Sequence, residues 1–549
     1  MSWHNARRTR RLVQFAVFAF FVYLLFAALQ HKAAFPLADL FFRFDPLAAL
    51  ATMLAARQWL PHLALAFATV AVTLVLGRVW CGWLCPLGTV LEWFRFKQAR
   101  RRAQRLPPRL PMTKYVVLIV IVAMAALGGM TLMVLDPLGL LTRTMTTSVI
   151  PAFDYAVTKT ERAMLHVSWL VPRVDWIESH LRGTVLPVVQ PLFMQAAALF
   201  LVFFAILALN MLADRFWCRY LCPLGALLGL VAKAAVLRPV FGESCAACNR
   251  CAAACPVGAI AGGDAAQGLT GDAAQRLTGD AAQGLTGEAA GGAAGESRPA
   301  LVSSECTVCL DCLVACETDG AMGFGLGRPG PWATYDPGRR QFVTAAAGGV
   351  GATVLLGVGA WKRQPSSYLL RPPGANDEQT FLRHCLRCTQ CMKVCPTSGL
   401  QPALNEAGLE GFWTPVLKPR LGYCDYGCTA CGHVCPSGAI PKLSLEEKRT
   451  KVIGVAVIDR NRCLPWSQNT PCIICQEMCP VPDKAVVLTR GKIVKSPQGF
   501  ENLVRNPIVV PHLCIGCGIC ETKCPVQGTA AIVVQTTPST AAPPPTTLG

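Results

Sequence analysis

The chain has 549 residues, of which 53% are hydrophobic and only 15% are charged, and its formal net charge is +19. Soluble globular proteins carry about 25% charged residues, so this composition excludes a wholly soluble enzyme and indicates that part of the chain lies in lipid. The basic residues cluster beside apolar runs, with few aromatic residues elsewhere, which favours the flanks of membrane helices over a nucleic-acid surface.

Four apolar runs in the first part of the chain predict membrane-spanning helices over 12–29, 62–79, 115–135 and 192–212. Each run is long enough to cross a hydrocarbon core of about 30 Å at about 1.5 Å per residue. Four Arg residues precede the first run, and the connection between the second and third runs is rich in Arg and Lys. We therefore expect the N-terminus and this connection in the cytoplasm. A shorter run over 226–237 predicts an interfacial helix.

The membrane part contains an internal repeat, which predicts two similar helical hairpins with a site between them. The sequence Asp-Pro-Leu begins at Asp45, after the first run, and again at Asp136, after the third. Asp-Pro is typical of turns, and this is the favoured interpretation. The alternative is that these two carboxyl groups accept protons.

The sequence Cys-x-x-x-Cys-Pro-Leu-Gly follows the second and fourth runs, with thiols at Cys81, Cys85, Cys218 and Cys222. The repeat places all four near the cytoplasmic end of the spans. One interpretation is local structure or a disulfide, although a cytoplasmic position disfavours the disulfide. The other is a redox-active thiol group or a further metal centre beside a quinol site.

The other 24 cysteines fall into six groups of four. They are Cys245, Cys248, Cys251 and Cys255; Cys306, Cys309, Cys312 and Cys316; Cys385, Cys388, Cys391 and Cys395; Cys424, Cys428, Cys431 and Cys435; Cys463, Cys472, Cys475 and Cys479; and Cys514, Cys517, Cys520 and Cys524. Three groups have the spacing C-x2-C-x2-C-x3-C-P of bacterial ferredoxins, and the others are variants. Structural zinc would divide its ligands between two knuckles, and disulfides would not need six copies of one loop. We therefore predict six 4Fe-4S clusters held by these 24 iron ligands.

In two-cluster ferredoxins the fourth Cys of one motif ligates the cluster of the other. We therefore predict that the first two motifs form a pair. In this pair Cys316 completes the cluster of Cys245, Cys248 and Cys251, and Cys255 completes that of Cys306, Cys309 and Cys312.

Low-complexity sequence interrupts this organisation. An eight-residue unit repeats within 262–297, which predicts a disordered insert, and 534–549 predicts a disordered tail. Arg339 and Arg340 open an apolar run over 342–361 and look like a twin-arginine export signal. An ordinary fifth span is the alternative, and both interpretations place the later part of the chain across the membrane. The glycines over 348–351 lack a nucleotide-binding context and favour close helix packing.

The four later motifs resemble those of the four-cluster subunits of molybdenum oxidoreductases. The resemblance implies that the outer motifs exchange their fourth cysteines, as do the inner motifs. Cys524 and Cys395 would then serve the outer clusters, and Cys479 and Cys435 the inner ones.

With these motifs in place, the chain resembles two families fused together. Residues 1 to about 330 are similar to NapH-type membrane quinol dehydrogenase subunits, and about 335 to 530 to NapG/MauM-type periplasmic ferredoxins. The expected organisation is an α-helical membrane domain with α+β ferredoxin-like domains. The predicted segments are 1–237 for the membrane domain, 238–330 for a two-cluster ferredoxin, 335–363 for the twin-arginine segment and fifth span, and 370–533 for a four-cluster ferredoxin.

The resemblance implies a multi-pass protein of the bacterial inner membrane, with the first ferredoxin domain in the cytoplasm and the second in the periplasm. It would oxidise quinol and pass electrons to a periplasmic reductase or cytochrome. The alternative is a NosR/CcoG-like membrane ferredoxin that supplies electrons for metal-centre assembly or cofactor reduction. No haem-attachment motif and no nucleotide site are found in the sequence.

Overall fold

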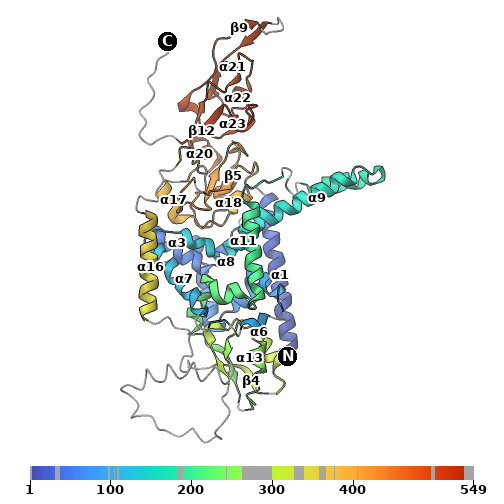
Figure 1. Cartoon of the computed structure of the whole chain (residues 1–549), viewed down its shortest axis with the longest axis vertical. Coiled ribbons are helices and arrows are strands. Elements are labelled where there is room, and N and C mark those ends of the chain that lie inside the picture. The colour runs from blue at the N-terminus through green and yellow to red at the C-terminus, as the bar shows by residue number, and fades with distance from the viewer. Residues whose placement is uncertain are drawn as a thin grey trace.

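The computed structural model describes residues 3–30, 37–96, 99–103, 106–107, 110–182, 187, 190–242, 244–261, 299–318, 320–326, 339–357, 366–375, 377–404, 406–495 and 501–536. The predicted insert over 262–297 and almost all of the predicted tail lie outside these residues. Figure 1 shows a helical bundle in the middle of an elongated molecule. A small unit containing α13 and β4 lies at one end of the bundle, and the segment from α17 onward lies at the other.

The bundle is built from helices, most of which contribute side chains to one apolar core. They are α1 (Trp3–Gln30), α3 (Pro46–Ala56), α4 (Ala66–Leu76), α5 (Pro86–Trp93), α7 (Thr113–Ala126), α8 (Pro137–Thr144), α11 (Ala196–Ala208), α12 (Pro223–Ala232) and α16 (Arg339–Gly357), with the short α2 (Leu40–Arg43) and α6 (Ala99–Ala103). A hairpin of α9 (Ile150–Met164) and α10 (Val171–Leu181) projects sideways from it.

The repeated motifs begin four of these helices. Asp45 and Asp136 accept backbone N–H groups at the starts of α3 and α8, while the thiol sulfurs of Cys85 and Cys222 accept them at the starts of α5 and α12. In all four helices Pro occupies the first position, where its missing N–H costs no hydrogen bond. The repeat therefore encodes the same helix start four times.

The predicted spans are more broken than the sequence suggests. Among the described helices, only α1 is long and apolar enough to cross a membrane alone. Helix α4 has 11 residues and α11 has 13, which is about 20 Å or less at about 1.5 Å per residue. Gly77, in a left-handed conformation, ends α4, and π-helical turns then precede each Cys-Pro helix start, as η2 (Trp80–Leu84) and η8 (Trp217–Leu221).

The prediction of an interfacial helix over 226–237 is wrong. Helix α12 begins earlier, at Pro223, and buries Leu224, Ala226 and Leu228. It packs against α4 and α7 inside the bundle. Its Cys-Pro start turns the chain back into the core, which the run length alone did not reveal.

The segment predicted as a fifth span forms α16, which packs along α7. A Cβ atom at Gly349 would lie 2.9 Å from the Cβ of Ala123 and 3.1 Å from the carbonyl oxygen of Val120. The absence of a side chain thus allows the helices to approach closely, as predicted for this glycine-rich stretch. In Figure 1 this helix stands upright beside the bundle and leads toward the far end.

The first ferredoxin unit covers the N-terminal end of the bundle. It contains the antiparallel pairs β1 (Leu237–Phe241) with β4 (Met322–Leu326) and β2 (Ile260–Ala261) with β3 (Ala300–Leu301), and the helices α13 (Arg250–Ala254) and α15 (Asp311–Ala315). Arg7 at the start of α1 forms a 2.9 Å ion pair with Asp311. The N-terminus of the chain therefore contacts this unit.

The second ferredoxin segment consists of two units in series. The proximal unit comprises α17 (Glu378–His384), α18 (Gln390–Lys393), β5 (Leu400–Pro402), β6 (Pro415–Leu417), α19 (Ala430–His433) and α20 (Leu445–Thr450). The distal unit comprises β7 (Val455–Ile458), α21 (Leu464–Ser467), α22 (Ile474–Glu477), β8 (Val486–Leu488), β9 (Lys492–Lys495), β10 (Glu501–Val504), β11 (Pro507–Val509), α23 (Ile519–Lys523) and β12 (Ile532–Gln535). Strand β5 pairs with β6, β8 with β11, β9 with β10, and β7 with β12.

Candidate functional site

Four of the six cysteine loops share an unusual backbone. In each, the residue before the second Cys and the residue after it have positive φ. The residues are Ala247, Asn249, Val308, Leu310, Arg387, Thr389, Gly516 and Gly518. Most are not glycine, so the conformation is strained. Successive backbone N–H groups in such turns form concave sites of the kind that bind iron–sulfur clusters.

Four pockets are each lined by four thiols. Their cysteine sets are Cys255, Cys306, Cys309 and Cys312; Cys395, Cys424, Cys428 and Cys431; Cys463, Cys472, Cys475 and Cys524; and Cys479, Cys514, Cys517 and Cys520. In each set, three cysteines come from one motif and the fourth from its neighbour. The other lining side chains are almost all apolar, which suits a cluster shielded from water.

The remaining two sets follow the same rule. Cys435 lies within electrostatic range of Cys385, Cys388 and Cys391. Cys245, Cys248 and Cys251 also lie together, and Cys316 packs against the apolar cluster that contains Cys251. An ion pair joins Arg250, next to Cys251, to Glu317, next to Cys316.

The predicted exchange within the first pair of motifs agrees with this geometry, but the outer and inner exchange of the four later motifs is wrong. Cys435, not Cys524, joins the Cys385 loop, and Cys524 joins the Cys463 loop. The reason is local: the β5–β6 hairpin folds the chain back, so that Thr397, just after Cys395, donates a hydrogen bond to the carbonyl of Tyr423, just before Cys424. Neighbouring motifs thus meet across a short loop, which costs less entropy than closing a long one.

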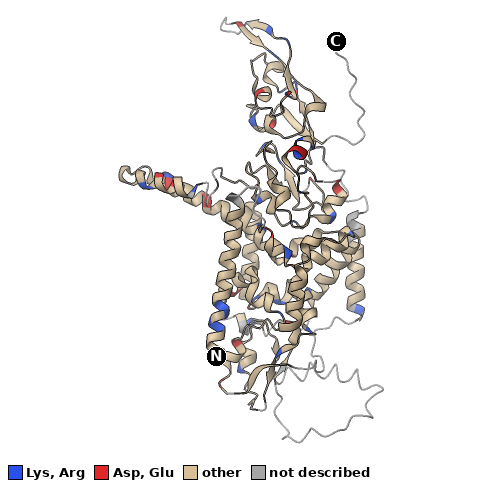
Figure 2. Cartoon of the chain, turned by 180° about the vertical axis from the view of Figure 1, so that it is seen from behind, with Lys and Arg blue, Asp and Glu red and all other residues tan. Residues whose placement is uncertain are grey.

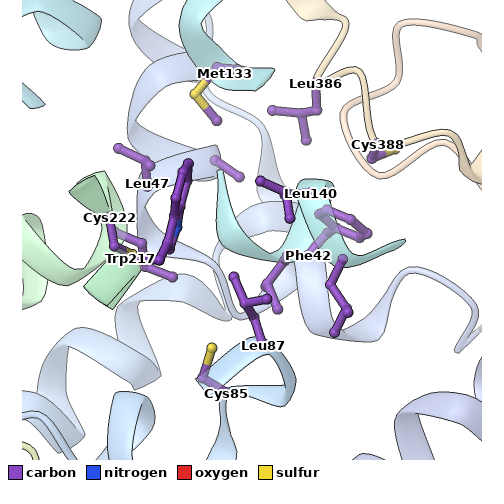
Figure 3. Close-up of a cluster of buried hydrophobic side chains, with 14 of the residues drawn as sticks. Phe42, Leu47, Cys85, Leu87, Met133, Leu140, Trp217, Cys222, Leu386 and Cys388 are labelled. Carbon is purple, nitrogen blue, oxygen red and sulfur yellow. The ribbon is translucent and has the colours of Figure 1, made fainter. Parts of the chain in front are cut away.

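The four later cluster sites form a sequence that leads away from the bundle. Leu386 and Cys388 belong to the bundle core, and Figure 3 shows them beside Met133 and Leu140. The proximal and distal units join where the backbone N–H of Cys424 donates to the carbonyl of Cys517 at 2.8 Å. The Cys385 site therefore lies at the bundle, and the Cys463 site in the outer unit.

Burial raises the pKa of the cluster thiols when no iron is bound. The pKa of Cys306 rises to about 12, that of Cys424 to about 12 and that of Cys517 to about 11, in each case first because of desolvation. Binding of iron to thiolates must displace these protons. Within the described part of the chain, no three His, Cys, Asp or Glu side chains are grouped closely enough for a single metal ion.

The thiols of Cys81, Cys85, Cys218 and Cys222, here called the bundle thiols, gather at the first-ferredoxin end of the bundle. All four are buried. Cys218 and Cys81 lie within electrostatic range of both Cys85 and Cys222. The structure thus brings together two pairs that are far apart in the sequence.

Two buried arginines cross between the repeats beside these thiols. Arg215 from the second repeat donates to the carbonyls of Cys81 at 3.4 Å and Gly88 at 3.2 Å in the first repeat. Arg78 from the first repeat contacts Gly225 in the second. Each precedes its Cys-x-x-x-Cys motif by three residues. Sequence reasoning missed both, although the repeated pattern Arg-x-Trp-Cys could have identified them.

The first ferredoxin unit docks directly on one bundle-thiol motif. Trp83 donates from its indole nitrogen to the carbonyl of Val308 at 3.0 Å. Glu305, next to Cys306, binds Arg78 at 3.2 Å, the Tyr115 hydroxyl at 2.9 Å and the Lys114 ammonium group. Burial alone would raise the pKa of Glu305, but the cations Lys114 and Arg78 outweigh it and lower this pKa.

Asp45 and Asp136 meet at the opposite side of the core. The two buried carboxyl groups lie within electrostatic range of each other. One oxygen of each caps its helix, and the other, Oδ2 of Asp45 and Oδ1 of Asp136, has no hydrogen-bond partner among the described residues. Arg143 lies beside Asp136 and stacks on Trp413 of the proximal unit. This carboxyl pair is therefore near the second ferredoxin segment, and the bundle thiols are near the first.

Comparison with known proteins finds two family models and several curated proteins that are similar to parts of the chain. Residues 59–107 and 195–242 match a family model described as a 4Fe-4S binding domain. Residues 244–322 match one described as a 4Fe-4S dicluster domain. No solved structure matches the chain.

Several curated proteins match over about a third of the chain. Ferredoxin-type protein NapG of Escherichia coli (strain K12) is 35% identical over 204 residues, which is 36% of this chain and 85% of that protein. Methylamine utilization ferredoxin-type protein MauM is 36% identical over 207 residues in both Methylorubrum extorquens and Paracoccus denitrificans. These matches cover 36% of this chain and 89% and 86% of the two MauM proteins.

Proposed function

Because the chain belongs to the NapG/MauM family of ferredoxin-type proteins, we propose that it is a membrane-bound iron–sulfur electron carrier that oxidises quinol and relays the electrons to a periplasmic reductase or cytochrome. The observation that carries this proposal is the series of four thiol sites leading outward from the apolar bundle. Six 4Fe-4S clusters would supply one-electron redox chemistry at the 24 ferredoxin-type cysteines. This stepwise chemistry suits a donor that loses two electrons in turn.

The surface of the bundle supports a place in the membrane. Large apolar side chains are exposed on α1, α4, α11 and α16, among them Phe15, Phe67, Phe204 and Val354. Soluble proteins rarely expose apolar patches of this extent. Figure 2 shows few charged residues on the middle of the bundle, whereas Lys and Arg gather near the N-terminus. The short helices α4 and α11 expose apolar side chains as well, so they would face lipid beside α1.

The position of the two ferredoxin segments supports the proposed sidedness. They lie at opposite ends of the bundle, and α16 connects them. With the Arg-rich N-terminus in the cytoplasm, the first unit would be cytoplasmic and the four-cluster segment periplasmic. The twin-arginine-like residues Arg339 and Arg340 begin α16, so we propose that this segment remains as a membrane anchor.

The test is reduction of the purified full-length protein by a menaquinol analogue under anaerobic conditions, followed by cluster absorbance. Bleaching by the quinol, and reoxidation by a periplasmic cytochrome, are the expected results. Bleaching by dithionite but not by quinol would reject quinol oxidation and favour the alternative role in metal-centre assembly or cofactor reduction.

A further inference from the structure

Beyond the six ferredoxin-type clusters, we propose that Cys81, Cys85, Cys218 and Cys222 together hold a seventh iron–sulfur cluster, shared between the two halves of the membrane repeat. Each half supplies only two cysteines, so neither half can complete the four ligands of a 4Fe-4S cluster alone. The structure brings the two pairs together within the bundle. The family model that matches both segments is described as a 4Fe-4S binding domain, but that description names no ligands.

Buried donors without acceptors immediately precede both Cys-x-x-x-Cys motifs. Among the described residues, the indole N–H groups of Trp80 and Trp217 and the Nε–H groups of Arg78 and Arg215 have no hydrogen-bond partner. All four side chains are more than nine-tenths buried. A buried donor that loses its partner costs about 1–3 kcal/mol, so four such atoms at equivalent positions of a repeat indicate an acceptor between them. The sulfides and thiolates of a cluster are acceptors of this kind.

The buried charges around the thiols are also unbalanced. Glu92 contacts three cations, Arg10, Arg95 and Arg215, and Arg95 also contacts Asp311. Glu305 contacts two, Arg78 and Lys114. Cations outnumber carboxylates in both groups, and a buried positive charge without a counter-ion is costly. A cluster ligated by four thiolates carries net negative charge, whereas four protonated thiols or two disulfides would carry none.

The helix starts place two of the four sulfurs at the same kind of backbone site. The backbone N–H of Gly88 points to the sulfur of Cys85 at 3.4 Å, and that of Gly225 to the sulfur of Cys222 at 3.2 Å. Backbone hydrogen bonds to sulfur of this kind are a feature of iron–sulfur sites. Cys85 and Cys222 occupy equivalent positions on α5 and α12, so the proposed cluster would lie on the approximate twofold axis of the repeat.

This site would extend the series of redox centres into the bundle. Gly82 lies between Cys81 and Cys85 and packs against the backbone of Thr307, in the Cys306–Cys309 loop. Arg215 is within electrostatic range of both Cys218 and Cys309. The bundle thiols are therefore neighbours of the buried cluster site of the first ferredoxin unit, and an electron held between the repeats could pass to it.

Iron content tests the proposal on the full-length protein purified anaerobically. Seven clusters predict about 28 irons per chain, against about 24 for six, at four irons per cluster. The double variant C81S/C218S should lose about four irons and one set of electron paramagnetic resonance signals. The matched control Leu221→Ala, in the same motif as Cys218, should keep all seven. Equal iron content in the wild type and the double variant would overturn the proposal, as would zinc bound at these thiols.

A second variant keeps the test decisive if the double variant does not fold. Trp80→Phe removes one indole N–H but no ligand, so it should leave the iron content unchanged and lower the reduction potential of a single cluster, because a hydrogen bond to sulfur stabilises the reduced form. A structural role for Trp80 would leave all cluster potentials at their wild-type values. Such a result, together with about 24 irons in the wild type, would leave six clusters only.

Discussion

Gly82 of the bundle packs directly against Thr307 of the first ferredoxin unit. A methyl group added at Gly82 would overlap the carbonyl oxygen of Thr307. The two residues come from motifs of different kinds, a Cys-x-x-x-Cys motif in the bundle and a ferredoxin loop. The fit between them fixes the distance between the bundle thiols and the Cys306–Cys309 loop.

The substitution Gly82→Ala should therefore loosen the first ferredoxin unit from the bundle. Overpacking at a rigid backbone contact costs about 1–3 kcal/mol. We expect faster hydrogen exchange over 303–310. The increase in exchange rate over the second ferredoxin segment should be smaller. Gly323→Ala is the control, because a Cβ atom there meets nothing within 4 Å. Equal exchange in both variants would mean that the contact does not hold the unit in place.

Glu305 should contribute strongly to the stability of the same interface. Its carboxylate is buried between Arg78 and Lys114, so Glu305→Gln leaves two cations underneutralised. Removing one partner of a buried ion pair costs about 3–5 kcal/mol. Thermal unfolding of the detergent-solubilised protein measures this loss. Glu317→Gln breaks the ion pair with Arg250 at the exposed surface and should leave the unfolding temperature nearly unchanged.

The sequence predicted which cysteines form motifs better than it predicted how those motifs pair. The six cysteine motifs were visible because Cys spacing is a local signal, and the internal repeat because Asp45 and Asp136 begin identical tripeptides. The partner of each fourth cysteine was not visible, since it depends on which loops the β5–β6 hairpin brings together. For the same reason, the pairing implied by resemblance to another family was wrong.

Helix lengths and buried polar contacts could not be predicted from the sequence either. Apolar runs do not show where Gly77 ends a helix or where a Cys-Pro step turns the chain back into the core. Sequence reasoning did not single out Arg78 and Arg215, yet both are fully buried. Their role depends on contacts between the two repeats, and single-segment patterns do not contain that information.

The cluster pairing predicts which signals each ligand variant should remove. Cys524→Ser should damage the Cys463 cluster in the distal unit, and Cys435→Ser the Cys385 cluster at the bundle. If the proposed route is right, only Cys435→Ser should slow the reduction of all later clusters by quinol. Electron paramagnetic resonance after quinol addition distinguishes the two variants. Loss of the signal of the Cys385 cluster in Cys524→Ser would instead support the exchange of fourth cysteines between the two outer motifs.

The proposed topology predicts opposite sidedness for two reporter fusions. A reporter fused after Glu317 should show that this position lies in the cytoplasm. A reporter fused at the C-terminus should show that the C-terminus lies in the periplasm. Val343 and Val354 are both exposed on α16. A variant that replaces both by Lys should insert α16 into the membrane less well, so that fewer molecules have a periplasmic C-terminus. The reason is that a charge within the hydrocarbon core costs about 2.5–3.5 kcal/mol on insertion scales. Matching sidedness of the two fusions would remove α16 as a span.

Variants of the carboxyl pair Asp45 and Asp136 distinguish a helix-capping role from a role in accepting protons. Both residues cap helices, and Asn caps a helix about as well as Asp. Asp45→Asn should therefore retain the fold, with a stability change below about 1 kcal/mol.

If the pair accepts protons when quinol is oxidised near the proximal unit, Asp45→Asn and Asp136→Asn should each slow quinol-dependent cluster reduction by at least tenfold. Reduction by dithionite, which needs no proton acceptor in the bundle, should keep its wild-type rate in both. Asp154→Asn is the matched control, because Asp154 is also buried but pairs with Arg182 in the projecting hairpin. Wild-type quinol kinetics in both variants would leave the carboxyl pair with helix capping alone.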